Sequence, residues 1–213
     1  MVSPLRGHPE GRPSTIKGLT AVLETPDTPA LAQTRAWVER AVIGLNLCPF
    51  AKAPQVKGLV RYVESEATDP AALLSDLMSE LQRLARTPAD KLETTLLVHP
   101  QVFNDFADFN DFLGVAEDAV ADMGLEGVIQ VASFHPDYRF EGTTADDITN
   151  ATNRSPHPTL HLIREESIDR AVAAFPEAET IYEANMATME RLGAKGWEAL
   201  RAGWTEGKEE GDT

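Results

Sequence analysis

The spacing of apolar residues predicts five helices. Over residues 69–86, leucines and a methionine recur with a period close to 3.6 residues. Asp69 followed by Pro70 is typical of a helix start, and Pro88 ends the pattern because the residue before a proline avoids helical geometry. The same reasoning predicts four further helices, over residues 28–45, 104–123, 168–175 and 177–192.

Four short runs rich in β-branched and other large apolar residues are typical of strands. They are Leu59–Val63, Thr94–Val98, Val128–Phe134 and Thr159–Ile163. Strands that alternate with helices indicate crossover connections and a largely parallel sheet. We therefore expect an α/β fold, with three or four central strands covered by about five helices. Both a three-layer arrangement and a ferredoxin-like α+β sandwich fit this element order, because the sequence does not decide the strand pairing.

The composition divides the chain into a central domain with two polar ends. Residues 28–205 are predicted to form a single globular domain, because 42% of the 213 residues are hydrophobic and 25% are charged. Residues 1–27 are rich in glycine, proline and small polar residues, which favours a mobile segment. Residues 206–213 are predicted to be a solvated acidic tail.

Charge and hydropathy exclude several classes of partner. The formal net charge of −15 repels phosphate backbones, so we expect no nucleic-acid partner. No apolar run approaches the roughly 18 to 20 residues of a membrane span. The chain has one cysteine, Cys48, which excludes an intrachain disulfide and favours a reducing compartment, so we expect a cytoplasmic protein.

Histidines stand at the ends of three predicted strands. His99 and His135 directly follow the second and third strands, and His157 precedes the fourth. If the second and third strands are parallel and the fourth is antiparallel to them, all three residues reach the carboxyl edge of the sheet, where open α/β folds bind ligands. The structural alternative is that a histidine before a proline only ends a strand and bonds the backbone. His161, within the fourth strand, is interpreted as a core or sheet-face residue.

Cys48 is followed by Pro49, which suits the first position of a helical turn. At such a cap, free N–H groups would lower the pKa of the thiol and make it a candidate nucleophile. The alternative is a buried, unreactive cysteine, because Leu47 and Phe50 flank it.

The long connection over residues 135–158 carries a further group of polar side chains. A connection of this length inside a compact domain is often functional. A short helix within it, with Thr144 and Asp147 as a capping box, would place Asp146, Asn150 and Asn153 on one face. The predicted substrate-binding residues are Arg139, Arg154, Asn150, Asn153, Tyr138 and Asp137, with the arginines holding an anionic group and Asp137 orienting an imidazole. The alternative is a solvated segment that covers the sheet edge.

Several strings of the chain resemble one family. GLNLCPFA, HPQVFNDFADFNDFL, QVASFHPDYRFEG and NRSPHPTLHLIREESI are similar to the family known as domain of unknown function 1415, over roughly residues 34–193. The resemblance implies occurrence in bacteria and plastids. It implies no activity, cofactor or catalytic residue.

Three functional hypotheses follow from these residues. The first is an enzyme that acts on a small polar or anionic molecule, with His99, His135 and His157 for proton transfer and Cys48 as nucleophile. The second is a site for a divalent transition metal such as zinc, copper or iron, with the same three histidines and Cys48 or Asp137 as ligands. The third is a non-catalytic binding or assembly protein whose histidines are structural. The sequence does not indicate the oligomeric state.

Overall fold

The computed structural model describes residues 27–174 and 180–205. The predicted acidic tail and the predicted mobile segment, apart from Asp27, lie outside the described residues. The helices are α1 (Pro29–Trp37), the π-helix η1 (Val38–Ile43), α2 (Lys52–Val56), α3 (Pro70–Arg86), α4 (Phe106–Asp122), the 3₁₀ helix η2 (Ile148–Asn153), α5 (Glu165–Ala174) and α6 (Ile181–Thr205). The strands are β1 (Val60–Glu64), β2 (Thr94–Val98), β3 (Ile129–Phe134) and β4 (Thr159–Arg164).

The four strands form one mixed sheet in the order β1-β2-β4-β3. β1 and β2 are parallel, whereas β4 is antiparallel to both of its neighbours, β2 and β3. The prediction of a largely parallel sheet is therefore wrong, since only one of the adjacent pairs is parallel. β1, β2 and β3 still run in the same direction, because the reversed strand β4 lies between β2 and β3.

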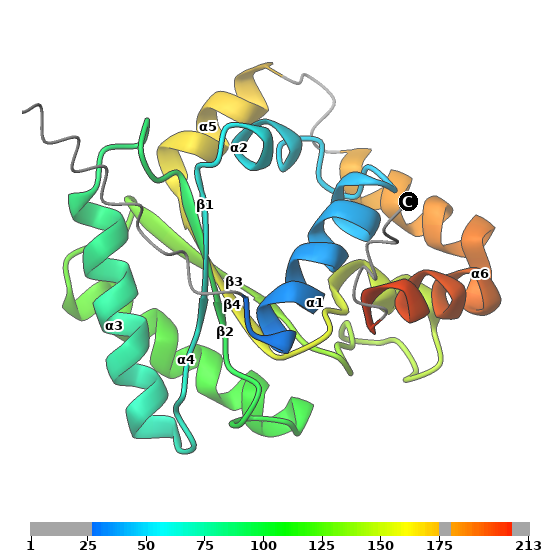
Figure 1. Cartoon of the computed structure of the whole chain (residues 1–213), viewed down its shortest axis with the longest axis horizontal. Helices are drawn as coiled ribbons and strands as arrows, with labels where there is room; N and C mark the ends of the chain where they lie inside the picture. Colours follow the sequence, from blue (N-terminus) through cyan, green and yellow to red (C-terminus); the bar gives the residue numbers. More distant parts are fainter. Residues whose placement is uncertain (1–26, 175–179, 206–213) are drawn as a thin grey trace, which may run out of the picture.

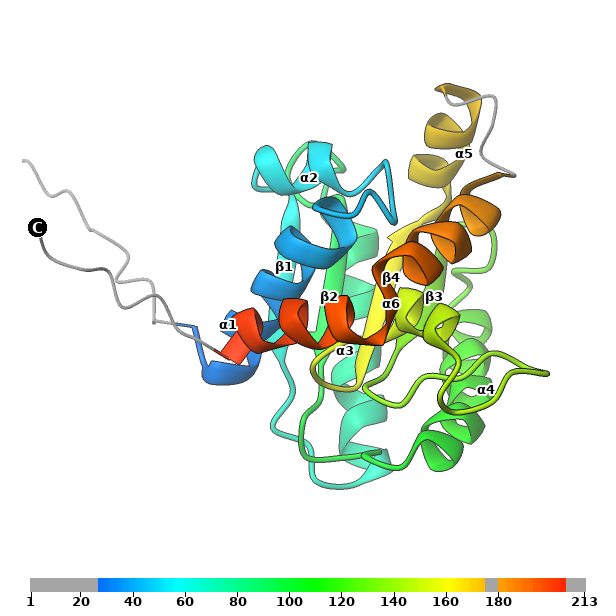
Figure 2. The same ribbon diagram turned by 90° about the vertical axis from the view of Figure 1, so that its right-hand side faces the viewer.

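Helices cover both faces of the sheet, which makes the fold a three-layer mixed α/β arrangement (Figure 1). α3 and α4 pack against one face, where Leu97 and Leu160 belong to a buried apolar cluster. α1, η1 and α6 cover the other face, where Tyr62 and Leu96 belong to a second cluster. Figure 2 shows α1 and α6 in front of the sheet and α3 and α4 behind it. The ferredoxin-like alternative does not describe this fold, because its helices would cover one face only.

The predicted helix over residues 69–86 is confirmed as α3. The Asp69 side chain accepts a hydrogen bond from the backbone N–H of Ala72 at 2.9 Å, and Pro70 occupies the first turn. Leu77 and Leu81 are fully buried toward the sheet, as the helical period requires. In residues 27–174 and 180–205, no helix combines the length and the apolar character needed to cross a bilayer.

The last helix differs from its prediction. The sequence pattern predicts that this helix ends at residue 192, and Gly193 does interrupt it, with φ of 65° and ψ of 172°. A second helical segment then continues to Thr205. Trp197 and Trp204 of this segment are buried in the cluster on the α1 face, and their rings are 5.3 Å apart. Burial of these two indoles stabilises a segment that the sequence pattern alone did not predict.

Candidate functional site

The strand directions place the three candidate histidines at one edge of the sheet. β2 and β3 end there and β4 begins there. The backbone N–H of His99 donates to the carbonyl of Pro158 at 3.0 Å, and that of His135 donates to the carbonyl of Asn153 at 3.3 Å. This edge is the carboxyl edge of β1, β2 and β3.

The side chains of His99 and His135 lie on the α4 face of the sheet. Both rings contact Phe109 of α4, with centroids 5.4 and 5.3 Å away. His99 Nδ1 donates to the carbonyl of Val102 at 3.1 Å, and His135 Nε2 donates to the carbonyl of Phe103 at 3.1 Å. Both rings are almost completely buried and fixed to the turn that follows β2.

Burial favours the neutral form of both of these imidazoles, although their hydrogen bonds to backbone carbonyls act in the opposite direction. Burial lowers the pKa of His99 to about 4, and burial also lowers the pKa of His135. His135 Nδ1 accepts a hydrogen bond from the backbone N–H of Asp137 at 3.0 Å, so both of its nitrogens are occupied. Asp137 therefore orients this imidazole through its backbone N–H. The sequence-based prediction was that its carboxylate would do so. His99 Nε2 is buried without a hydrogen-bond partner.

His157 lies on the opposite face of the sheet from His99 and His135. Its Nε2 pairs with Oε1 of Gln33, on α1, at 2.7 Å. Burial lowers the pKa of His157 as well. The three histidines share an edge but are separated by the sheet, so they do not form one ligand set. Within the described ranges, no three side chains of His, Cys, Asp or Glu are grouped in a way that could hold a metal ion.

The polar segment between β3 and β4 is fixed largely by its own side chains. Asn150 is fully buried: its Oδ1 accepts from the N–H of Phe140 at 3.0 Å and its Nδ2 donates to the carbonyl of Thr144 at 2.8 Å. Arg154 donates to the carbonyls of Tyr138 at 3.2 Å and Ala145 at 2.6 Å. These contacts give Asn150 and Arg154 a structural role in the loop.

The common polar face predicted for this segment is not formed. The short helix is a 3₁₀ helix that begins after Asp147, so Asp146 lies outside it and is exposed. Asn150 is buried inside the loop, while Asn153 is half-buried and bonds His135 through its carbonyl. Arg139 is exposed. Positions spaced by three or four residues share a face only in an α-helix, which explains the difference.

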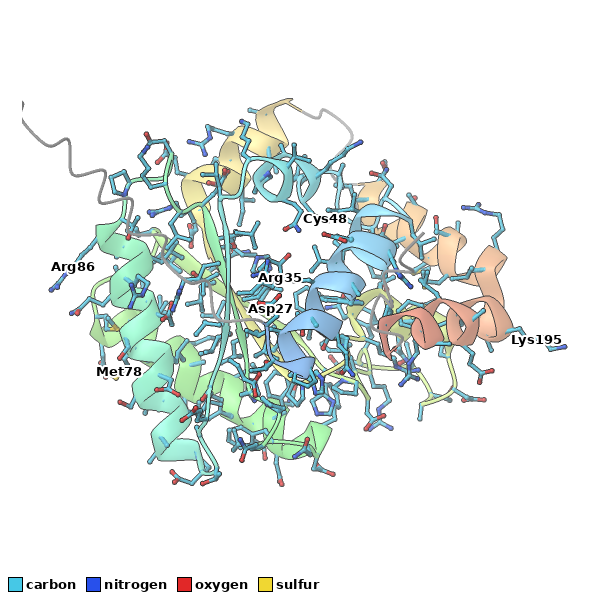
Figure 3. All side chains as sticks on the ribbon, viewed as in Figure 1. Asp27, Arg35, Cys48, Met78, Arg86 and Lys195 are labelled. Atoms are coloured by element: carbon cyan, nitrogen blue, oxygen red, sulfur yellow. The ribbon has the colours of Figure 1, made fainter. Side chains whose placement is uncertain are left out.

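Tyr138 and Cys48 lie in separate places in the structure. Tyr138 packs against Phe106 of α4 and Phe140, with ring centroids 5.3 and 5.0 Å away. Cys48 lies on the other face of the sheet, where the chain passes from η1 to α2 (Figure 3). Burial raises the pKa of its thiol, although the N–H groups of Phe50 and Ala51 act in the opposite direction. The sequence predicted a lowered pKa, and burial outweighs the cap.

Cys48 lines a cavity of about 640 Å³ between the sheet and the helices on the α1 face. Its floor is a row of four paired strand residues, Tyr62, Leu96, His161 and Ala132, one from each strand. The remaining walls come from α1, η1, the loop after η1, α2 and α5, and include Trp37, Val38, Val42, Phe50, Pro54 and Ile168. The lining is predominantly apolar.

The lining of this cavity differs between the two edges of the sheet. Near the carboxyl edge it includes Trp37 and Phe134, whose rings meet edge to face at 5.1 Å. The charged lining residues Lys57, Glu93 and Arg170 precede β1, precede β2 and follow β4, so they mark the amino edge. Arg170 is paired with Glu166 at 3.0 Å and with Glu93 at 3.4 Å.

His161 is the polar group at the centre of the cavity floor. Its Nε2 lies 2.7 Å from Thr94 Oγ1, and that hydroxyl donates to the carbonyl of Leu162 at 2.7 Å. Burial lowers the pKa of His161 to about 4, so the ring is neutral at pH 7. From its place within the predicted strand, His161 was expected only to be a core or sheet-face residue. A usable signal existed, since His161 is a polar position between two leucines, Leu160 and Leu162, in the middle of its strand.

Among the comparisons with known proteins, only the scan of family models gives a match. The model of a family described as "Protein of unknown function (DUF1415)" matches residues 29–199. The chain belongs to the DUF1415 family. The strings quoted above therefore identify the family correctly. No curated protein and no solved structure matches the chain. DUF1415 membership names no reaction.

Proposed function

We propose that this DUF1415 protein binds a largely apolar small molecule in the cavity on the α1 face of the sheet. The observation that carries the proposal is the cavity itself. Its volume of about 640 Å³ falls within the range of roughly 300 to 1,000 Å³ that is usual for small-molecule sites. A mostly apolar lining with a small number of polar groups, here including His161 and Thr94, is also the usual composition of such sites.

The histidines at the carboxyl edge support this choice indirectly. His135 uses both ring nitrogens for backbone hydrogen bonds, and His99 is enclosed beside Phe109. His157 is bonded to Gln33 on the other side of the sheet. These contacts favour the third sequence-based hypothesis, a binding protein with structural histidines, over an enzyme or a metal protein at that edge. Its ligand site would be the cavity and not the polar loop. A cytoplasmic location stays a prediction from the single cysteine.

The proposal is tested by filling the cavity. Ala132 lies on the floor beside His161, so Ala132→Phe would occupy much of the space. N-phenyl-1-naphthylamine, a neutral apolar fluorophore, should bind the unmodified protein with a blue-shifted, enhanced emission. Ala132→Phe should weaken this binding at least tenfold. Ala121→Phe makes the same chemical change at an exposed position of α4 and should have no effect.

Two results would contradict the proposed ligand site. If the fluorophore does not bind, or if both variants bind it as the unmodified protein does, the cavity is not a ligand site. Circular dichroism and urea unfolding of both variants show that a lost signal reflects a filled cavity and not an unfolded protein.

A further inference from the structure

The hydrogen bonds below the cavity floor fix which nitrogen of His161 carries its proton. The carbonyl of Leu162 can only accept, so the Thr94 hydroxyl uses its single proton in that bond. The 2.7 Å contact between Thr94 Oγ1 and His161 Nε2 therefore needs a proton on Nε2. In the neutral ring this leaves Nδ1 with a lone pair and no proton.

His161 Nδ1 has no hydrogen-bond partner among the described residues. Trp37 Nε1 and His99 Nε2 are unpaired nitrogens that are completely inaccessible within the described residues. His161 Nδ1 is also unpaired, but it does not belong to this inaccessible group. Nδ1 is therefore accessible. Because His161 is only partly exposed and lines the cavity, the cavity is the space that Nδ1 faces.

The charges around the cavity limit what can meet this lone pair. The imidazole carries no positive charge, and the carboxylate of Glu93 is paired with Arg170 at the amino edge of the sheet. The exposed Lys57 is also at this edge and not on the floor. An anionic group on the floor would meet a lone pair in an apolar environment without a compensating charge, which is unfavourable. A neutral O–H or N–H donor would instead satisfy the nitrogen.

From this geometry, and on the basis of the proposed function, we infer the class of ligand. The ligand is a neutral, mostly apolar molecule with a hydroxyl or N–H group that donates a hydrogen bond to His161 Nδ1. The apolar body lies against the walls, and the donor fixes its orientation over the row Tyr62, Leu96, His161 and Ala132. Thr94 acts as a positioning residue, because it holds the ring in the tautomer that offers this acceptor.

The test uses three probes with one ring system, measured by isothermal titration calorimetry at pH 7.5. 2-Naphthol carries the donor, 2-methoxynaphthalene lacks it, and 2-naphthoate is anionic. We expect 2-naphthol to bind about tenfold more tightly than 2-methoxynaphthalene, since one hydrogen bond contributes about that factor. 2-Naphthoate should bind most weakly.

Two variants of His161 separate its two nitrogens. His161→Gln places an amide near the Nε2 position, where it can still bond Thr94, but has no acceptor at the Nδ1 position. His161→Asn places its amide oxygen near the Nδ1 position and loses the bond to Thr94. The preference for 2-naphthol over 2-methoxynaphthalene should disappear in His161→Gln and be largely retained in His161→Asn. The ratio of two affinities within one variant is insensitive to a general loss of stability.

The outcomes distinguish this inference from the proposed function. Equal binding of 2-naphthol and 2-methoxynaphthalene that Ala132→Phe abolishes overturns the role of His161 and leaves the cavity as a ligand site. Tightest binding of 2-naphthoate also overturns it and assigns the dominant contact to the cations Lys57 and Arg170 at the amino edge. If no probe binds, both the inference and the proposed function fail.

Discussion

Burial of the neutral His99 ring predicts a specific loss of stability in mild acid. Its pKa falls from 6.5 to about 4 on folding, so between these values the unfolded chain binds a proton that the folded protein does not. The free energy of unfolding must therefore fall as the pH is lowered through 6.5 toward 4. At pH 5 the shift corresponds to a loss of about 2 kcal/mol relative to pH 7.5.

His99→Asn removes this titration while preserving the hydrogen bond to the carbonyl of Val102. The asparagine side-chain amide lies near the Nδ1 position and can still donate to the carbonyl of Val102. The variant should be less stable overall, because it loses ring packing against Phe109. Its loss of stability between pH 7.5 and pH 5.0 should be smaller than that of the unmodified protein by about 2 kcal/mol.

The assay is urea unfolding followed by circular dichroism at both pH values. Leu77→Ala is the control, because it destabilises the same core by about 2 to 5 kcal/mol without adding or removing a titrating group. It should keep the full pH dependence of the unmodified protein. Identical pH dependence in all three proteins would refute the account of His99 as a buried, neutral histidine.

Two further predictions address the thiol and the last helix. Because burial raises the pKa of Cys48, the rate of its alkylation by iodoacetamide should increase with pH, with a midpoint above pH 9.0. Bound 2-naphthol should slow the alkylation, because Cys48 lines the cavity. A midpoint near or below pH 8.5 would restore the nucleophile hypothesis. Gly193→Ala should lower the free energy of unfolding by about 1 to 3 kcal/mol, because φ of 65° with ψ of 172° is a backbone conformation that is nearly restricted to glycine. Gly114→Ala is the control, because Gly114 lies inside α4 and has open space around an added methyl group. This variant should be neutral or stabilising by up to about 1 kcal/mol. Equal effects of the two variants in thermal unfolding would contradict the kink at Gly193.

Local patterns predicted the elements of this fold better than their arrangement. The helix over residues 69–86 and the strand over 94–98 match α3 and β2 closely, because caps and apolar periods are encoded by neighbouring residues. The place of β4 between β2 and β3 was not predictable in this way, since strand pairing joins segments far apart in the chain. The helical segment that follows Gly193 was missed because it is stabilised by tertiary burial of Trp197 and Trp204.

The candidate site shows the same limit at the level of single side chains. Strand direction was enough to expect His99, His135 and His157 at one edge, but it did not decide the face on which each ring lies. Side chains alternate between faces along a strand, and this alternation separates His157 from the other two. The raised pKa of Cys48 and the accessible Nδ1 of His161 arise from tertiary burial and from a cavity, which no local motif encodes.

The most direct test of the account is to locate a bound probe by nuclear magnetic resonance. Two-dimensional ¹H–¹⁵N spectra of the full chain, including the histidine ring nitrogens, would be recorded during a titration with 2-naphthol. We predict the largest shifts at Ala132, Cys48 and the Nδ1 of His161, with little change at the rings of His99 and His135. Shifts centred on His99, His135 and Tyr138, with the residues of the cavity unchanged, would contradict the central claim and return the site to the carboxyl edge of the sheet.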